Sequence, residues 1–315
     1  MDSFQTLWDQ YNSLAVNVEK DIIGYFAAGW KPTGGFDENG RSEFDPSIDV
    51  ARIPMREYPF THLSSALVPL MVYSLIVMSG IVLLRCRTVA QREKSQRQLI
   101  REEYLYPFKF VYNVTQIFLC AYMSVHALVI AKHEGLLNLQ CGAFHFEDPK
   151  VGELLWLFYV SKILDFMDTV FIIASCKQSQ FTFLHTFHHF TIYSVYWLNV
   201  NINYDGDIYF TILANGFIHT IMYSYYWISM HIPKVKDEKT NRLKYGIWWK
   251  KYLTQMQLIQ FLLMMGQALW IVFGAKCTES PPRVTKLYFG YILLMFGLFM
   301  WFFKKTYSRR KKKRD

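Results

Sequence analysis

Apolar residues gather in seven long stretches, separated by polar segments that carry most of the charges. Each stretch has about 20 mostly apolar residues, which is the length that a helix needs to cross a bilayer. The first contains LVPLMVYSLIVMSGIVLL, and the sixth contains QFLLMMGQALWIVF. The expected spans are residues 60–84, 108–131, 152–175, 182–200, 208–230, 252–274 and 284–303. The pattern therefore predicts an all-α polytopic membrane protein with seven transmembrane helices.

The composition agrees with a membrane protein and excludes several other classes. Hydrophobic residues make up 52% of the 315 residues and charged residues only 19%, against roughly 25% in an average soluble protein. Disordered chains, collagens and small disulfide-rich domains are excluded. A net charge of +9 would suit nucleic acid, but the basic residues flank the spans, which favours a lipid bilayer as partner and no nucleic acid. The first 20 residues lack the apolar core of a signal peptide.

Basic residues also predict the orientation. If the C-terminus is cytosolic, 23 of the 34 Lys and Arg residues lie in cytosolic segments, as the positive-inside rule requires. The chain then divides into a luminal segment (1–59), a seven-span domain (60–304) and a basic cytosolic tail (305–315). In the tail, Lys312 and Lys313 stand fourth and third from the end, which matches the dilysine signal for retrieval to the endoplasmic reticulum. We expect that membrane as the location, while a plain basic tail that binds anionic lipid is the alternative.

The luminal segment has a helical repeat near its start. Phe4, Leu7, Trp8, Tyr11 and Leu14 recur at the spacing of one helix face. This pattern predicts an amphipathic helix on the bilayer surface. The alternative is a loosely ordered terminus.

Lys, Arg, Asp and Glu residues lie deep in only one of the seven spans, the third. Lys162, Asp165 and Asp168 stand at i, i+3 and i+6, so they share one side of the helix. Charges inside a membrane are costly and are usually functional. Lys162 and Asp165 can pair, so a structural ion pair between helices is the alternative.

Three histidines open the fourth span. His185, His188 and His189 stand at i, i+3 and i+4, which groups them on one face. Neutral imidazoles in such a group could bind a transition metal. They could equally act as a nucleophile or a proton carrier near neutral pH.

The next two spans each carry a polar stripe of their own. The fifth has Asn215, His219, Met222 and Tyr223 on one face, and the sixth opens with Thr254, Gln257 and Gln260. A single such residue is more often an interhelical hydrogen bond. With about 1.5 Å of rise per residue, all four stripes fall in one layer in the cytosolic half of the bilayer. This predicts a buried polar site that opens to the cytosol, and the basic 231–251 loop indicates an anionic substrate.

These stripes resemble the motifs of the ELO family, the very-long-chain fatty acid elongases of the endoplasmic reticulum. The family's HxxHH matches His185 to His189, and its NxxxHxxMY matches Asn215 to Tyr223. Its KxxExxDT matches Lys162 to Thr169, and its TxxQxxQ matches Thr254 to Gln260. One departure is Asp165, where the family usually has glutamate, and we expect it to alter pairing geometry without loss of activity.

The resemblance implies that six helices enclose a tunnel for an acyl chain. It implies the condensing step of elongation, in which malonyl-CoA and a long acyl-CoA give 3-oxoacyl-CoA, CO2 and CoA, with no bound cofactor or metal. The other enzymes of the cycle would be partners: a 3-oxoacyl-CoA reductase, a 3-hydroxyacyl-CoA dehydratase and an enoyl-CoA reductase. Whether two copies form a homodimer stays open.

The resemblance also suggests roles for single residues. His188 would be the nucleophile, and His219 and Asn215 would orient the thioester and stabilise an enolate oxygen. Asp168 would hold one of the three histidines of the HxxHH motif, the box histidines, in its tautomer, as carboxylates do elsewhere. The remaining expected site residues are His185, His189, Lys162, Asp165, Tyr223, Gln257 and Gln260. Lys250 and Lys251 would help to bind CoA phosphates, and ordinary positive-inside bias is the alternative for them.

Two other classes remain as rivals. A membrane di-iron desaturase or hydroxylase also uses HxxHH, but it needs further histidine boxes, and the remaining histidines outside the four motifs are scattered: His62, His126, His133, His145 and His231. A seven-helix receptor has the same number of spans, but its ligand site would normally face the luminal or outer side.

The topology also predicts one disulfide. Cys141 and Cys277 follow the second and sixth spans, so both fall on the luminal side, where disulfides persist. Cys86 and Cys176 face the reducing cytosol, and Cys120 lies within a span. The alternative is two free thiols in luminal loops.

Overall fold

The computed structural model describes residues 2–30, 53–85, 94–137, 141–232, 234–237, 242–245, 249–274 and 279–311. Within these ranges the chain forms eight α-helices. They are α1 (Asp2–Ala27), α2 (Leu63–Arg85), α3 (Lys94–His133), α4 (Gly152–Ala174), α5 (Phe183–Ile202), α6 (Tyr209–His231), α7 (Lys250–Leu269) and α8 (Pro282–Lys311). The short elements are η3 (Pro54–Glu57), η5 (Gly206–Ile208), the π-helical turn η6 (Trp270–Gly274) and two strands, β1 (Lys234–Asp237) and β2 (Arg242–Tyr245).

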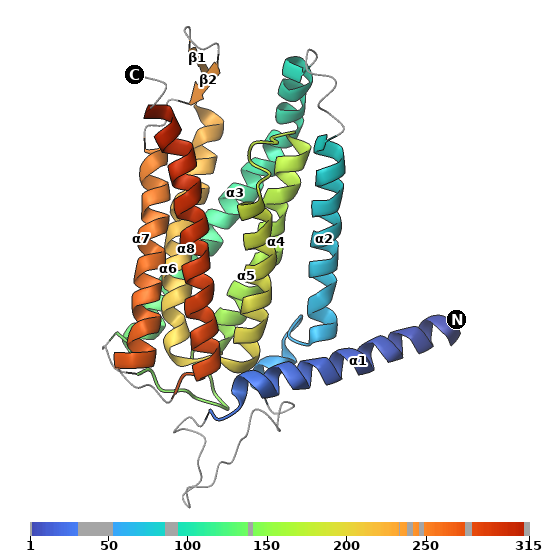
Figure 1. The fold of residues 1–315 in the computed structure, drawn as a ribbon, viewed down its shortest axis with the longest axis vertical. Helices are drawn as coiled ribbons and strands as arrows, with labels where there is room; N and C mark the ends of the chain where they lie inside the picture. Colours follow the sequence, from blue (N-terminus) through green and yellow to red (C-terminus); the bar gives the residue numbers. More distant parts are fainter. Residues whose placement is uncertain are drawn as a thin grey trace, which may run out of the picture.

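Helices α2 to α8 run along a common direction, and α1 lies across one end of this bundle (Figure 1). The β1–β2 hairpin and the end of α8 lie at the opposite end (Figure 1). A chain that crosses a bilayer an odd number of times must have its N-terminal and C-terminal helices on opposite sides. The arrangement agrees with the predicted topology, while which end is luminal stays a prediction.

The helices confirm the predicted class, an all-α polytopic membrane protein. Four are long and apolar enough to cross a bilayer by composition alone: α2, α3, α7 with η6, and α8. Helices α4, α5 and α6 have 23, 20 and 23 residues, so at 1.5 Å per residue they are about as long as the hydrocarbon core is thick. Charged residues reduce the apolar character of α4, and His, Asn and Thr residues reduce that of α5 and α6. Seven spans therefore remain the interpretation of the sequence pattern.

Two helix boundaries differ from the expected spans. Helix α3 begins at Lys94, 14 residues before the expected start at 108, because a helix can continue beyond the bilayer without apolar residues. The expected basic loop 231–251 contains an antiparallel hairpin that pairs Lys234 with Tyr245 and Asp237 with Arg242. Each strand has only four residues, which is too short for its alternation of polar and apolar residues to stand out in the sequence.

Helices α3 and α6 form the most extensive contact of the bundle. Gly216 of α6 makes this contact close, since a Cβ atom there would lie 2.9 Å from the backbone oxygen of Cys120 on α3. Helix α2 packs at the side of the bundle against α4 and α5 (Figure 1). Its outer residues, including Met71 and Leu75, are exposed, as expected for a surface that faces lipid.

Helix α1 confirms the predicted helical repeat and extends it to Ala27. Ile23 and Ala27 are buried. The Tyr11 hydroxyl donates to the backbone oxygen of Ser64 at 2.7 Å, and Arg56 donates to the buried carboxylate of Glu19. These contacts attach α1 to the bundle. Its place on a bilayer surface stays a prediction.

Candidate active site

Helix α5 presents the three box histidines together. The backbone N–H of His185 donates to the Thr182 hydroxyl at 3.2 Å, so Thr182 caps the helix where the box begins. The ring centroids of His185 and His189 are 4.4 Å apart, and those of His188 and His189 are 5.7 Å apart. The spacing in the sequence therefore does group these side chains.

A hydroxyl on α4 contacts the first of these histidines. The Thr169 Oγ1 atom lies 2.8 Å from His185 Nε2. Thr169 in turn lies 3.2 Å from the hydroxyl of Tyr73, which is buried on α2. The sequence predicted that Asp168 holds a box histidine, but no such contact is found among the described residues. Asp168 instead accepts a hydrogen bond from the Tyr223 hydroxyl at 2.9 Å, because the side of α4 that carries Asp168 is turned toward α6.

The ionisable residues of α4 form a buried ion pair. Lys162 Nζ lies 3.2 Å from Asp165 Oδ2, and both side chains are less than 5% exposed. The ammonium also lies 4.0 Å from the centre of the Phe158 ring, a favourable cation–π position. The predicted pairing of Lys162 with Asp165 is therefore confirmed. The aspartate side chain reaches the lysine although it is shorter than the glutamate that is usual in the family.

Helices α3 and α6 complete a polar network around these carboxylates. Gln116 Nε2 donates to Asp165 Oδ1 at 2.7 Å. The Tyr223 hydroxyl lies between Asp168 and Asp165, and it is 3.3 Å from the hydroxyl of Tyr112. Sequence reasoning missed Gln116 and Tyr112. Their i, i+4 spacing in a mostly apolar span was the available signal.

Two imidazole atoms of predicted site residues are buried without a hydrogen-bond partner. They are Nδ1 of His189 and Nδ1 of His219, as judged over the described part of the chain, where Nδ1 of His126, outside the predicted site, is a third such atom. The His219 ring lies beside Tyr223, with centroids 5.9 Å apart. An unsatisfied buried polar atom is costly, so both atoms are places where a polar group of a substrate would bind favourably.

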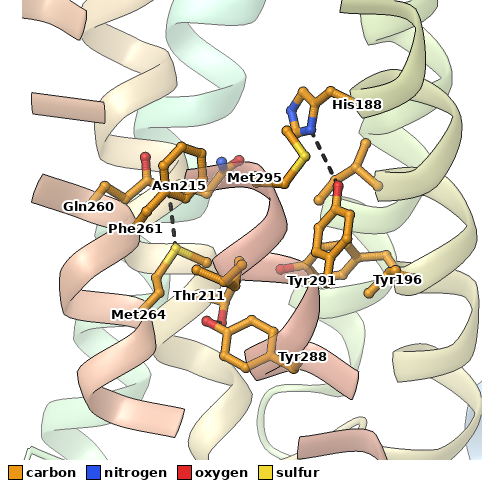
Figure 2. Close-up of a pocket in the computed structure, with 13 residues that line it drawn as sticks. His188, Tyr196, Thr211, Asn215, Gln260, Phe261, Met264, Tyr288, Tyr291 and Met295 are labelled. Carbon is orange, nitrogen blue, oxygen red and sulfur yellow. Dashed lines mark hydrogen bonds between the residues drawn. The ribbon is translucent and has the colours of Figure 1, made fainter. Parts of the chain in front are cut away.

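A narrow cavity begins beside the second box histidine, between α5, α6, α7 and α8. His188, Asn215 and Gln260 line one end of it (Figure 2), and all three were predicted site residues. Tyr196, Thr211 and Tyr288 line the other end, and Phe261, Met264 and Met295 are also among the lining residues (Figure 2). The cavity volume is about 20 Å³, which is room for about one water molecule. A longer ligand would have to displace flexible side chains such as the two methionines.

A tyrosine of α8 points toward His188 across this cavity (Figure 2). The Tyr291 hydroxyl lies 3.3 Å from His188 Nδ1 and 3.2 Å from Thr191 Oγ1. Gln260 Nε2 lies 3.4 Å from the sulfur of Met264. Sequence reasoning missed Tyr291, because a tyrosine in an aromatic-rich span gives no signal by itself.

Other predicted site residues lie apart from this cavity or outside the described residues. Gln257 Nε2 lies 3.8 Å from the sulfur of Met222, and Lys250 and Lys251 are exposed at the start of α7. Residues outside the description are Lys312, Lys313 and Cys277.

The cysteines agree with part of the disulfide prediction. Cys141 is disulfide-bonded, while Cys120 and Cys176 form no disulfide within the described residues. Cys277, the predicted partner, lies outside the described residues, so the pairing itself stays a prediction. Within the described ranges, no group of three or more His, Cys, Asp or Glu side chains is arranged to hold a metal ion.

The fold and the site define a polytopic membrane protein with a buried histidine, carboxylate and amide site beside a narrow, largely apolar cavity. The chain belongs to the GNS1/SUR4 (ELO) family, whose model matches residues 58–315.

Curated relatives cover about two thirds of the chain. A protein named very long chain fatty acid elongase 2 from Mus musculus is 36% identical over 208 residues, which are 65% of this chain and 67% of the relative. Very long chain fatty acid elongase 5 from Tachysurus fulvidraco is 38% identical over 203 residues, 64% of this chain and 65% of the relative. The elongase 5 of Homo sapiens is 35% identical over 203 residues, 64% of each chain.

Proposed function

We propose that this membrane protein is the condensing enzyme of fatty acid elongation. It would join malonyl-CoA to a long-chain acyl-CoA and release 3-oxoacyl-CoA, CO2 and CoA. The observation that carries the proposal is the place of His188, at the polar end of a cavity whose middle is apolar. The names of the relatives support the same pathway.

The first half-reaction uses His188 as nucleophile. A ring nitrogen attacks the thioester carbonyl carbon, the carbon–sulfur bond breaks, and CoA leaves with the proton that the imidazole gives up. The acyl chain then remains on the histidine and extends into the apolar cavity. Asn215 and Gln260 lie at the same end and can donate amide N–H groups to the carbonyl oxygen.

The second half-reaction uses malonyl-CoA as the carbon nucleophile. Loss of CO2 leaves an enolate, whose carbon attacks the acyl carbonyl. The bond to the imidazole breaks, and His188 leaves with one proton taken up. Nδ1 of His219 is buried and has no hydrogen-bond partner among the described residues, so His219 is suited to hydrogen-bond the enolate oxygen.

The remaining predicted features are part of the same proposal. Lys250 and Lys251 are exposed at the start of α7 and would bind the phosphates of CoA. The location would be the endoplasmic reticulum membrane, with the N-terminus luminal and the C-terminus cytosolic. The partners would be the reductases and the dehydratase of the elongation cycle.

Purified protein in detergent or proteoliposomes tests the proposal with labelled malonyl-CoA and a panel of acyl-CoAs. We expect a chain two carbons longer, and we expect His188→Ala to abolish it. His133→Ala is the matched control, because its side chain is 86% exposed at the end of α3. Intact-mass measurement with acyl-CoA alone should show an acyl adduct on the wild type and none on His188→Ala. Full turnover by His188→Ala would contradict the assignment of the nucleophile.

A further inference from the structure

We propose that Tyr291 and Thr191 are positioning residues that fix the tautomer of His188, so that its Nε2 atom carries the free electron pair. The inference rests on the proposed function, since it concerns how the nucleophile is prepared. Thr191 and Tyr291 lie outside every motif that the sequence singled out.

Three contacts connect these residues in a chain. His188 Nδ1 lies 3.3 Å from the Tyr291 hydroxyl, and that hydroxyl lies 3.2 Å from Thr191 Oγ1. Thr191 Oγ1 donates to the backbone oxygen of Phe187, one turn earlier on α5, at 2.7 Å. A second, longer contact of 3.3 Å leads from Thr191 Oγ1 to the backbone oxygen of His188.

The direction of this chain follows from the last contact. A backbone carbonyl can only accept, so the single proton of the Thr191 hydroxyl is directed at the carbonyls of its own helix. Thr191 must then accept the proton of Tyr291. Tyr291 has no second proton, so it must accept from His188.

The consequence concerns the chemistry of His188. A neutral imidazole carries one N–H, and the chain places it on Nδ1. Nε2 is then the unprotonated nitrogen, which is what a nucleophile needs. In metal sites and catalytic triads a hydrogen-bonded partner often selects the tautomer in the same way. Here the partner is a neutral hydroxyl, so the selection adds no charge to the membrane interior.

Tyr291 also connects two elements that the reaction needs. It lies on α8 and is 8% exposed, and it lines the cavity beside His188 (Figure 2). The orientation of the nucleophile therefore depends on the packing of α8 against α5. Thr191 does not line the cavity, so it can be changed without altering the shape that an acyl chain would meet.

Thr191→Val tests the inference because it removes the hydroxyl and keeps the shape. Tyr291 would then be free to donate to His188 Nδ1, which would place the proton on Nε2, the wrong nitrogen. We expect kcat to fall about tenfold, because the loss of one net hydrogen bond in the transition state slows a reaction by about that factor. KM for acyl-CoA should stay unchanged. Thr191→Ser should restore kcat, because it keeps the hydroxyl.

A double variant separates this chain from a loss of packing. Tyr291→Phe removes the other hydroxyl, and Thr191→Val combined with Tyr291→Phe should be no slower than Thr191→Val alone, because both act through one chain. The release of CoA from acyl-CoA without malonyl-CoA should slow in parallel, since it reports the first half-reaction. The melting temperature of these variants in detergent should match that of the control variant, Thr186→Val.

The control is Thr186→Val on the same helix. Thr186 Oγ1 also lies near backbone oxygens of the preceding turn, those of Thr182 and Phe183, but its hydroxyl contacts no tyrosine or histidine in the described residues. If Thr191→Val and Thr186→Val both match the wild type, the inference is wrong while the proposed function stands. If the wild type itself neither releases CoA nor elongates, the proposed function fails.

Discussion

At the residue scale, hydroxyl groups contact two of the three box histidines, and within the described residues no carboxylate contacts them. His185 is paired with Thr169, and His188 is paired with Tyr291. The two carboxylates of α4 are used elsewhere, since Asp165 neutralises Lys162 and Asp168 accepts from Tyr223. A charged partner beside each histidine would add to the cost of burying charge in a membrane, so neutral hydroxyls orient these imidazoles at lower cost.

The ion pair gives a stability prediction. Asp165→Asn should lower the free energy of unfolding by about 3–5 kcal/mol, because it leaves the Lys162 ammonium buried and unpaired. Lys162→Met combined with Asp165→Asn should recover much of that loss, since neither charge of the pair then remains. Thermal unfolding in detergent measures both. Equal stability of Asp165→Asn and the wild type would show that the pair contributes nothing to the fold.

At the scale of elements, the sequence predicted the helices better than their partners. Long apolar stretches defined the seven bundle helices, and the histidine spacing predicted the face of α5. The extension of α3 to Lys94 was missed, because a polar helix outside the bilayer has no distinctive pattern. Tyr73 and Gln116 were missed for another reason. Their partners are set by the rotation of each helix in the bundle, which a single sequence does not determine.

Helix α1 gives a prediction at the same scale. Leu7, Leu14, Val18 and Tyr25 share one side of the helix and are 65%, 65%, 41% and 62% exposed. A stripe of this kind at one end of a transmembrane bundle fits the interfacial layer of a bilayer. We expect a fluorescent label on Leu7→Cys in proteoliposomes to be quenched by lipid-borne quenchers.

Asp9→Cys supplies the matched control for this label. Asp9 is also exposed, and two residues along a helix correspond to about 200° of rotation, so it faces away from Leu7. Its label should respond to aqueous quenchers. If both labels respond to aqueous quenchers alone, α1 lies clear of the membrane.

At the scale of the whole molecule, three helices together close the cavity that starts at His188. Tyr196 of α5, Thr211 of α6 and Tyr288 of α8 meet at its far end, and Thr211 Oγ1 lies 2.9 Å from the Tyr288 hydroxyl. Eight residues of α5 separate His188 from Tyr196, which is about 12 Å along the helix. No stretch of sequence indicated this end, because it forms only when the three helices pack.

This closed end predicts a change in product length. Tyr288→Leu removes the phenol ring and its hydrogen bond to Thr211, so an acyl chain on His188 could extend farther between α6 and α8. We expect the longest product to gain at least one two-carbon unit, while elongation of the shortest accepted acyl-CoA continues at a similar rate. Tyr288→Phe is the matched control, because it keeps the ring and should leave the longest product unchanged. Chromatography of products labelled from malonyl-CoA measures the distribution, and an unaltered longest product in Tyr288→Leu would place the end of the acyl site elsewhere.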